Sequence, residues 1–245
     1  MTSFGSNGTV PSVQSSTEFY ASQAIYGDLL DVGVTTLGLY PPGNGIPGQA
    51  VAVRTSGSSA QDMILEDSVY LKMLMRSNAS SKKMIRKAFE EADDHKEDVE
   101  KAREKWEKDT EKWEKDQKKK KDDAKKNEGS SVKPSDGDED KGPGDFVEPT
   151  PNGTAAAFID LRKGDLSALI SIRKAGDYLH LVDALGGEDF DWVLRVPLRD
   201  DIDLYEVADQ LAEDKRTIII EPRLTLMAWT MRERNLPAED RKSTR

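Results

Sequence analysis

Histidine is the side chain best suited to acid–base or metal chemistry near neutral pH, and the 245 residues include two, His95 and His180. Neither has a second histidine at metal-binding spacing, and the absence of cysteine excludes thiolate nucleophiles and cysteine-ligated zinc. The 46 Asp and Glu residues are so numerous that no pair stands out as a catalytic acid and base. We therefore predict that the chain is not an enzyme and holds no metal or cofactor.

One glycine motif has the spacing of a dinucleotide-binding loop. Gly43, Gly45 and Gly48 match G-x-G-x-x-G. That function needs a helix to begin at the loop, so that its amino end can hold the pyrophosphate. Residues 49–54 instead alternate small and β-branched side chains, which is typical of a strand. We therefore interpret the motif as an exposed loop.

Composition narrows the class of protein. Lys and Arg number 36 against 46 Asp and Glu, and the net charge of −10 argues against a nucleic-acid partner. The sequence has no apolar run of about 18 residues, so we predict no membrane-spanning helix. It also lacks a secretory leader, and we predict a protein made in the cytoplasm.

The longest helical signal covers residues 81–126. Apolar residues recur there every seven positions, at Ile85, Ala92, Val99, Trp106 and Trp113. This spacing puts one narrow apolar seam on a long, highly charged helix. Two interpretations stay open: a solvated helix that docks its first turns, or a helix that binds a partner. Residues 127–154 follow it, and their glycines, prolines and acidic run predict a disordered linker.

The flanking regions combine helix and strand patterns. Residues 60–76 read as a helix with a methionine-rich face. Residues 155–162, 166–173 and 178–182 alternate apolar and polar side chains, and turns at 163–165 and 175–177 join them into an antiparallel meander. A further strand is predicted over 190–198, a helix over 203–216, a short strand over 217–220 and a last helix over 222–234. The fold class is therefore α+β.

Basic residues mark the ends of the predicted meander strands. Arg162 and Lys163 flank the first turn, and Arg173 and Lys174 flank the second. Strands of about nine residues with cationic tips could form a membrane-inserting hairpin, and the tips would attract acidic lipid headgroups. A soluble antiparallel sheet gives the same pattern.

Four stretches carry a family resemblance: SSTEFYASQAIYGDLL, VRTSGSSAQDMILEDSVYLKMLMRSNA, FVEPTPNGTAAAFIDLRKGDLSALISIRKAGDYLHLVDALGGEDF and TIIIEPRLTLMAWTMRERN. With the charged insert between the two halves, their order resembles the pore-forming domain of gasdermins, most closely the fungal gasdermin-like regulators of cell death. The acidic net charge departs from the basic domains usual in that family, which favours a local cationic patch.

The resemblance implies one pore-forming domain over residues 1–245, with a twisted antiparallel sheet flanked by helices. It implies a protein that moves from the cytoplasm to the plasma membrane and oligomerises on acidic phospholipids. Permeabilisation would then kill the cell in allorecognition, through assembly with an incompatible allelic variant. A scaffold protein that binds a partner through the long helix is the alternative.

The same resemblance designates two sets of site residues. The lipid-binding set is Lys82, Lys83, Arg86, Lys87, Arg162, Lys163, Arg173 and Lys174. The membrane-inserting set is Phe158, Ile159, Leu161, Leu166, Leu169, Ile170 and Ile172, within a candidate hairpin over residues 155–182.

Overall fold

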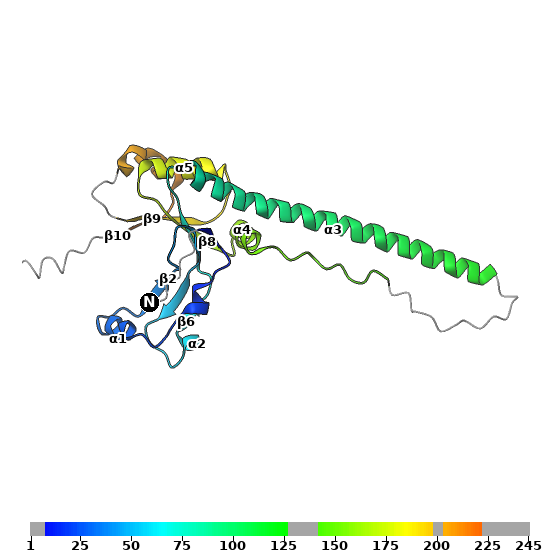
Figure 1. The fold of residues 1–245 in the computed structure, drawn as a ribbon, viewed down its shortest axis with the longest axis horizontal. Helices are drawn as coiled ribbons and strands as arrows, with labels where there is room; N and C mark the ends of the chain where they lie inside the picture. Colours follow the sequence, from blue (N-terminus) through cyan, green and yellow to red (C-terminus); the bar gives the residue numbers. More distant parts are fainter. Residues whose placement is uncertain (1–7, 127–141, 198–202, 222–245) are drawn as a thin grey trace, which may run out of the picture.

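The computed structural model describes residues 8–126, 142–197 and 203–221 (Figure 1). Its elements in chain order are β1 (Gly8–Thr9), η1 (Ser15–Glu18), α1 (Ala24–Asp31), β2 (Thr36–Leu39), β3 (Gly45–Ile46), β4 (Gly48–Gln49), β5 (Val51–Arg54), α2 (Ala60–Met63), β6 (Ile64–Glu66), β7 (Tyr70–Leu74), α3 (Ala79–Lys126), α4 (Gly153–Lys163), β8 (Ser167–Ser171), α5 (Ala175–Leu185), β9 (Trp192–Pro197), η2 (Leu204–Val207), α6 (Ala208–Asp214) and β10 (Ile218–Glu221). The predicted α+β class and the long helix are confirmed.

A five-stranded sheet with the order β10-β9-β8-β7-β4 forms the centre of the molecule. Its strands β7, β8, β9 and β10 are all parallel, and β4 alone runs antiparallel to its neighbour β7. Helices connect each parallel strand to the next, as parallel pairing requires. The predicted antiparallel meander is therefore wrong for this sheet, because the segments between its strands are crossover helices rather than tight turns.

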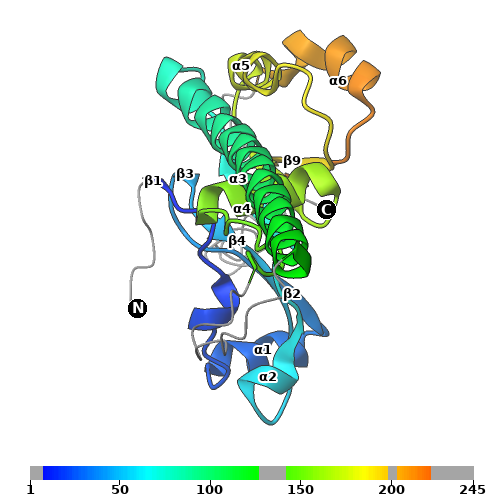
Figure 2. The same ribbon diagram turned by 90° about the vertical axis from the view of Figure 1, so that its right-hand side faces the viewer.

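The N-terminal region adds smaller sheets. β2, β5 and β6 form an antiparallel three-stranded sheet, and β1 pairs with β3 in parallel. Figure 2 shows β2, α1 and α2 at the end of the molecule opposite α5 and α6. The strand predicted after the glycine motif is confirmed as β5, but the exposed loop is corrected: Gly45 and Gly48 lie in the short strands β3 and β4, and residues 46–48 are buried.

The segment predicted as the first meander strand is the helix α4, and its end signals explain why. The side chain of Asn152 accepts a hydrogen bond from the backbone N–H of Ala155 at 2.8 Å, which caps the amino end. Gly164 ends the helix in the left-handed conformation with φ 80°. Between the caps, Phe158 and Leu161 are three apart and both fully buried, which is a helical rather than a strand spacing.

Two further predictions are corrected. Residues 178–182 lie in the helix α5, so the candidate hairpin over 155–182 is a helix–strand–helix unit. Residues 60–76 form one turn of α2 and then the strands β6 and β7 instead of a single helix. The central residues of β7 are buried on both faces, and such a strand has no alternation to distinguish it from a buried helix.

The main hydrophobic core lies between the sheet and the helices α3, α4 and α5. Phe89 of α3 packs edge-on against Phe158 of α4, with ring centroids 4.7 Å apart, and also contacts Phe190 at 5.6 Å. Ile85 and Ala92, the first two residues of the heptad seam, are buried in this core. The first turns of the long helix are therefore docked, as one of the two interpretations predicted.

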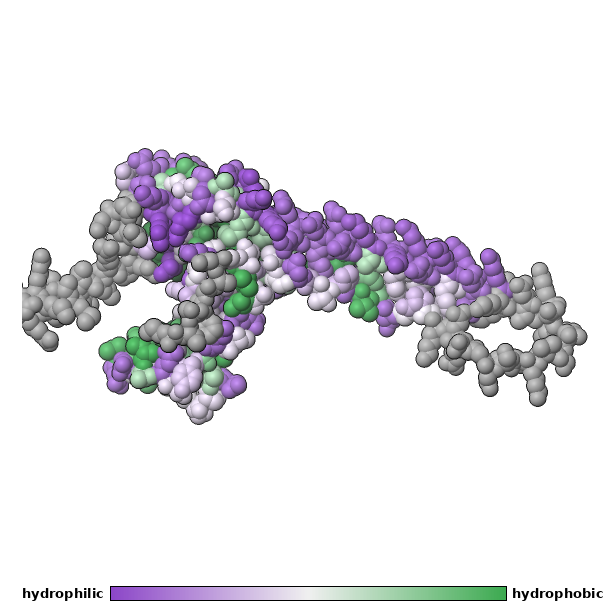
Figure 3. Space-filling model, in the orientation of Figure 1, coloured by the Kyte–Doolittle hydropathy of each residue, from purple (hydrophilic) through white to green (hydrophobic). Residues whose placement is uncertain are grey.

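Beyond the core, α3 continues as an arm that a second segment follows. Residues 142–152 run back along it toward α4 (Figure 1). Trp106 donates a hydrogen bond to the carbonyl of Gly144 at 3.0 Å, and its ring lies 6.0 Å from that of Phe146. Figure 3 shows hydrophilic residues on the side of α3 that faces away from this segment. The predicted disorder of 127–154 is thus corrected for residues 142–154, while 127–141 lie outside the described residues.

One buried carboxylate ties the ends of two strands together. Asp177, only 3% exposed, accepts backbone hydrogen bonds from Ser77 after β7 at 2.7 Å and from Arg173 and Lys174 after β8 at 2.9 and 3.3 Å. Hydrogen bonds to an ionised acceptor are stronger than neutral ones. Asp177 therefore holds the start of α5 and two strand ends in a fixed relation.

We expect Asp177→Ala to lower the free energy of unfolding by about 3 kcal/mol, because three buried N–H groups lose a charged acceptor. Urea unfolding followed by circular dichroism measures the change. The exposed Asp189→Ala is the matched control and should shift stability by less than about 0.5 kcal/mol. Equal effects of the two substitutions would contradict the role of Asp177.

We expect Trp106→Ala to loosen the segment 142–152 without weakening the core, because the tryptophan supplies both a ring contact and a hydrogen bond to it. Hydrogen–deuterium exchange should rise at least several-fold in residues 143–150 while the exchange of β7, β8 and β9 stays unchanged. Lys105→Ala, at an exposed position of the same arm, should leave both regions unaffected. Unchanged exchange in Trp106→Ala would show that other contacts hold the segment.

Candidate functional site

The two faces of the parallel sheet differ in what they carry. Side chains alternate along each strand, and one set, which includes Met73, Ile170 and Leu194, belongs to the core beneath the helices. We call the opposite side the polar face; its residues on the three central strands are Tyr70, Lys72, Leu74, Ser167, Leu169, Ser171, Val193, Arg195 and Pro197. The polar face carries two basic side chains at the centre of a sheet, which is unusual.

Lys72 is the more deeply placed of the two cations. It is 9% exposed, and its ammonium group donates a hydrogen bond to the carbonyl of Pro41 at 2.9 Å. The same ammonium lies 5.2 Å from the ring centroid of Tyr40, within cation–π distance. Burial, and then the positive charge of Arg195, lower the pKa of Lys72 from its ordinary value.

Arg195 approaches the same aromatic ring from β9. Its guanidinium lies 5.7 Å from the Tyr40 centroid and donates a hydrogen bond to the hydroxyl of Ser171 at 3.3 Å. Ser171 and Arg195 are direct neighbours in the register of β8 and β9. Tyr40 therefore accepts two cations at once, and strands β7, β8 and β9 each contribute one polar side chain to a single cluster: Lys72, Ser171 and Arg195.

More positive charge follows at the carboxyl ends of the strands. Burial, and then the charge of Arg173, lower the pKa of Arg76, while the carboxylate of Asp177 acts in the opposite direction. The carboxylates nearby are engaged with the backbone: Asp177 binds the strand ends, and Asp203 accepts from the N–H of Ala175 at 2.7 Å. The carboxyl edge of the sheet is where open α/β sheets and α/β barrels bind ligands.

Neither histidine belongs to this cluster. His95 lies on α3, three residues after the buried Ala92. His180 lies on α5 rather than on the strand predicted for it. Among the residues that the structure describes, no group of three His, Asp or Glu side chains could hold a metal ion. The polar face is therefore a cationic, hydroxyl-bearing surface suited to an anion or to developing negative charge.

The predicted lipid-binding residues occupy three places. Arg162 bridges Asp93 of α3 and Glu188 after α5, with both contacts at 2.6 Å, and these partners raise its pKa. Lys163 is exposed at the end of α4, and Arg173 and Lys174 are exposed after β8. The sheet and its crossovers therefore separate Arg162 from Arg173, and the two do not form the tips of one hairpin.

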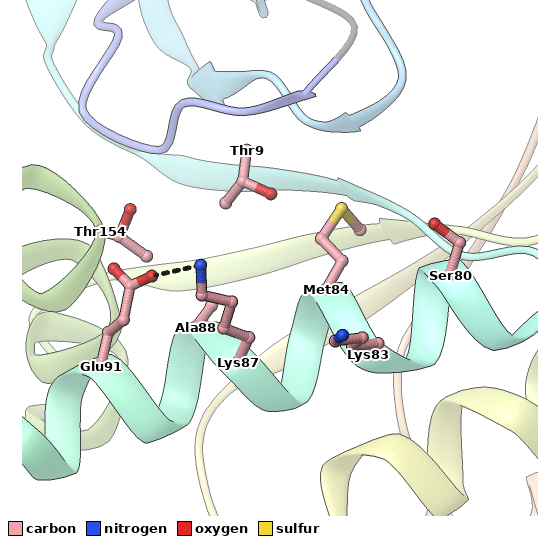
Figure 4. A pocket seen from close by; sticks show the side chains of 8 residues that line it. All are labelled: Thr9, Ser80, Lys83, Met84, Lys87, Ala88, Glu91 and Thr154. Carbon is pink, nitrogen blue, oxygen red and sulfur yellow. Dashed lines mark ion pairs between the residues drawn. The ribbon is translucent and has the colours of Figure 1, made fainter.

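The remaining four predicted residues lie together on the first turns of α3. Lys82 and Arg86 form ion pairs with Asp183 of α5. A hollow of ≈ 560 Å³ beside them is lined by Ala79, Lys82, Lys83, Arg86, Lys87, Glu90 and His180. Across the helix, a second hollow of ≈ 350 Å³ contains the Lys87–Glu91 ion pair of 3.6 Å, and Figure 4 shows the lysine and the glutamate facing each other. Carboxylates thus offset much of this basic surface.

The predicted membrane-inserting residues lie on α4 and around β8. Phe158, Leu161, Leu166, Leu169, Ile170 and Ile172 are buried, and Ile159 is partly buried against the core. Their insertion into a bilayer would require the core to open and α4 to refold. No helix in the described ranges is long and apolar enough to cross a membrane. Pore formation and partner binding by the long helix both stay predictions.

Sequence reasoning missed Tyr40, Lys72 and Arg195. Residues 60–76 were predicted as a helix, in which Lys72 would be one more surface lysine. Arg195 lies within the correctly predicted strand over 190–198, but sequence reasoning did not single it out. The sequence does contain one indication of this site, a lysine between Leu71 and Met73 inside a buried strand. It can be recognised only when residues 70–74 are predicted as a strand.

Comparison with known proteins finds a similar fold but no related sequence family. No family model and no curated protein matches the sequence. Among solved structures, an amidohydrolase from Thermotoga maritima MSB8 is similar, with a TM-score of 0.57 and 18% sequence identity over 89% of this chain. The match covers 50% of that protein, so this chain spans about half the length of its structural neighbour.

This likeness corrects one prediction. The chain was predicted not to be an enzyme, because no catalytic motif stands out in its sequence. Its fold is nevertheless one that an amidohydrolase contains. The physical reason for the error is that a site at the carboxyl ends of several strands is assembled from residues far apart in the chain. Such a site leaves no compact motif.

We expect Lys72→Met to stabilise the fold at neutral pH by about 1 kcal/mol, because it removes a charge that burial disfavours. The gain should shrink as the pH rises through the lowered pKa of Lys72 toward 10.5, since the wild-type lysine then becomes neutral in the folded state. Urea unfolding at pH 7 and pH 10 tests this. The exposed Lys163→Met should show no comparable gain, and a gain that grew with pH would contradict the sign.

Proposed function

We propose that this chain takes part in the hydrolysis of an amide bond, with the polar face of the parallel sheet on the substrate side. Two observations support the proposal. The fold resembles half of an amidohydrolase, and Lys72 on β7 and Arg195 on β9, the strands on either side of β8, both contact the ring of Tyr40. The second observation carries the proposal, because two neighbouring cations could stabilise the negative charge that develops during the reaction.

Amide hydrolysis places negative charge where these cations lie. When water attacks the amide carbonyl, the oxygen becomes an oxyanion in the tetrahedral intermediate, and the enzyme must stabilise it with fixed donors. An ammonium and a guanidinium in a partly desolvated site act more strongly than in bulk water. The Ser171 hydroxyl adds a neutral donor or acceptor between them. We assign to this face the binding of substrate and the stabilisation of charge.

The surroundings of the face suit that role. Tyr40 and Pro41 contact Lys72 from the N-terminal region, so within the described part of the chain a carbonyl and a ring hold the lysine. Asp177 fixes the ends of β7 and β8 through backbone hydrogen bonds, which keeps the strand ends in register. Rigid strands position such side chains better than loops do.

A pair of valine substitutions tests the location. Val193 lies on the polar face, half-buried on β9, whereas Val182 is 46% exposed on the outer side of α5. The full chain is incubated with a panel of N-acyl amino acids, simple N-acyl amines and cyclic amides, and released amine is measured with fluorescamine. We expect hydrolysis of at least one class, a loss of about 10-fold or more in Val193→Trp and none in Val182→Trp.

Two outcomes would overturn the proposal. The first is that the wild-type chain hydrolyses no amide in the panel. The second is that Val193→Trp, shown by circular dichroism to be folded, retains full activity. Equal losses in Val193→Trp and Val182→Trp would likewise place the activity elsewhere than on the polar face.

A further inference from the structure

We infer that a hollow between α3, α4 and the returning segment 142–152 binds a free amino acid with an apolar side chain. The segment runs back along α3 to reach α4 there (Figure 1). The hollow measures ≈ 480 Å³, a size typical of small-molecule sites. Its lining includes no residue of the polar face, so the inference does not depend on the proposed function.

The first step concerns the apolar part of the lining. On each helix these residues lie three or seven positions apart, and such residues share one face. They are buried or half-buried, so they form the floor of the hollow, and an aliphatic side chain of a ligand would be shielded from water there. They are Ala92 and Val99 of α3, Pro151 of the returning segment, and Ala156 and Ile159 of α4.

The second step concerns four charged side chains that border this floor, two of each sign. They are Lys96 on α3, Glu148 on the returning segment, and Asp160 and Lys163 on α4. In the described part of the chain, none of these four side chains forms a hydrogen bond or an ion pair. By contrast, Lys101 on the same helix pairs with Glu97 at 3.1 Å. The hollow therefore has both cationic and anionic groups available to a ligand.

The third step concerns the balance of charge. The two lysines and the two carboxylates cancel, and Arg162, which also lines the hollow, is already bound by Asp93 and Glu188. His95 adds an imidazole that is counted as neutral at pH 7. A ligand with one charge alone would leave either the lysines or the carboxylates without a partner.

A free apolar amino acid has the complementary composition. Its carboxylate can accept charge-assisted hydrogen bonds from the lysines, and its ammonium can donate such bonds to Glu148 and Asp160. Its side chain can meet the apolar floor at the same time. The lining therefore favours a zwitterion over a simple acid or a simple amine.

The test compares L-leucine with three analogues that each lack one group. Leucinamide lacks the carboxylate, N-acetylleucine lacks the ammonium and glycine lacks the side chain. Binding of each to the full chain is measured by isothermal titration calorimetry. We expect leucine to bind, and each analogue to bind at least about 10-fold more weakly.

Two double variants locate the site. We expect Lys96→Met/Lys163→Met to weaken leucine binding by about 10-fold or more and to remove the preference for leucine over leucinamide. Glu148→Gln/Asp160→Asn should weaken leucine binding similarly and remove the preference over N-acetylleucine. Lys105→Met, at an exposed position of α3 outside the lining, is the matched control and should bind like the wild type.

Three outcomes would overturn the inference. The first is no binding of leucine at millimolar concentration. The second is that leucine binds no more tightly than any one of the three analogues. The third is that the double variants, shown by circular dichroism to be folded, bind leucine like the wild type. Weaker binding in both double variants but not in Lys105→Met would support the site, whether or not the chain hydrolyses an amide.

Discussion

Parallel pairing of β7, β8 and β9 is the constraint on which the rest of the structure depends. Parallel neighbours cannot be joined by tight turns, so each needs a crossover, and here helices supply it. Those helices bury one face of the sheet, and Tyr40 and Pro41 of the N-terminal region contact Lys72 on the other. The same arrangement brings the carboxyl ends of all these strands to one edge. The core, the polar face and the basic residues at the carboxyl ends of the strands all follow from this parallel pairing.

The long helix is compatible with this constraint because a crossover has a minimum length but no maximum. The first turns of α3 pack on the sheet and complete the core through Ile85 and Phe89. The remainder extends as an arm, and residues 142–152 return along its seam before α4 begins. The helix α3 alone carries 32 of the 82 charged residues. The domain beneath it has an ordinary apolar core, so the poor overall hydropathy is a property of the arm.

The polar face differs from the core because it buries a charged side chain, which lowers stability. Burying Lys72 against a carbonyl and a ring costs stability, and its lowered pKa expresses that cost. A sheet built for stability alone would place an apolar residue there, as it does at Leu71 and Met73 on the same strand. Sites where a fold accepts such a cost are commonly functional.

The sequence by itself determined the elements whose signals are local. The long helix follows from a seven-residue repeat, β9 from clean alternation, and β10 from a short apolar run. The caps of α4, Asn152 and Gly164, were also present but were outweighed by an apparent alternation. Only the tertiary structure decided that the strands are parallel, because pairing depends on contacts between segments distant in the chain. It alone placed Lys72 and Arg195 on one ring, since residues 123 positions apart meet only through the sheet register.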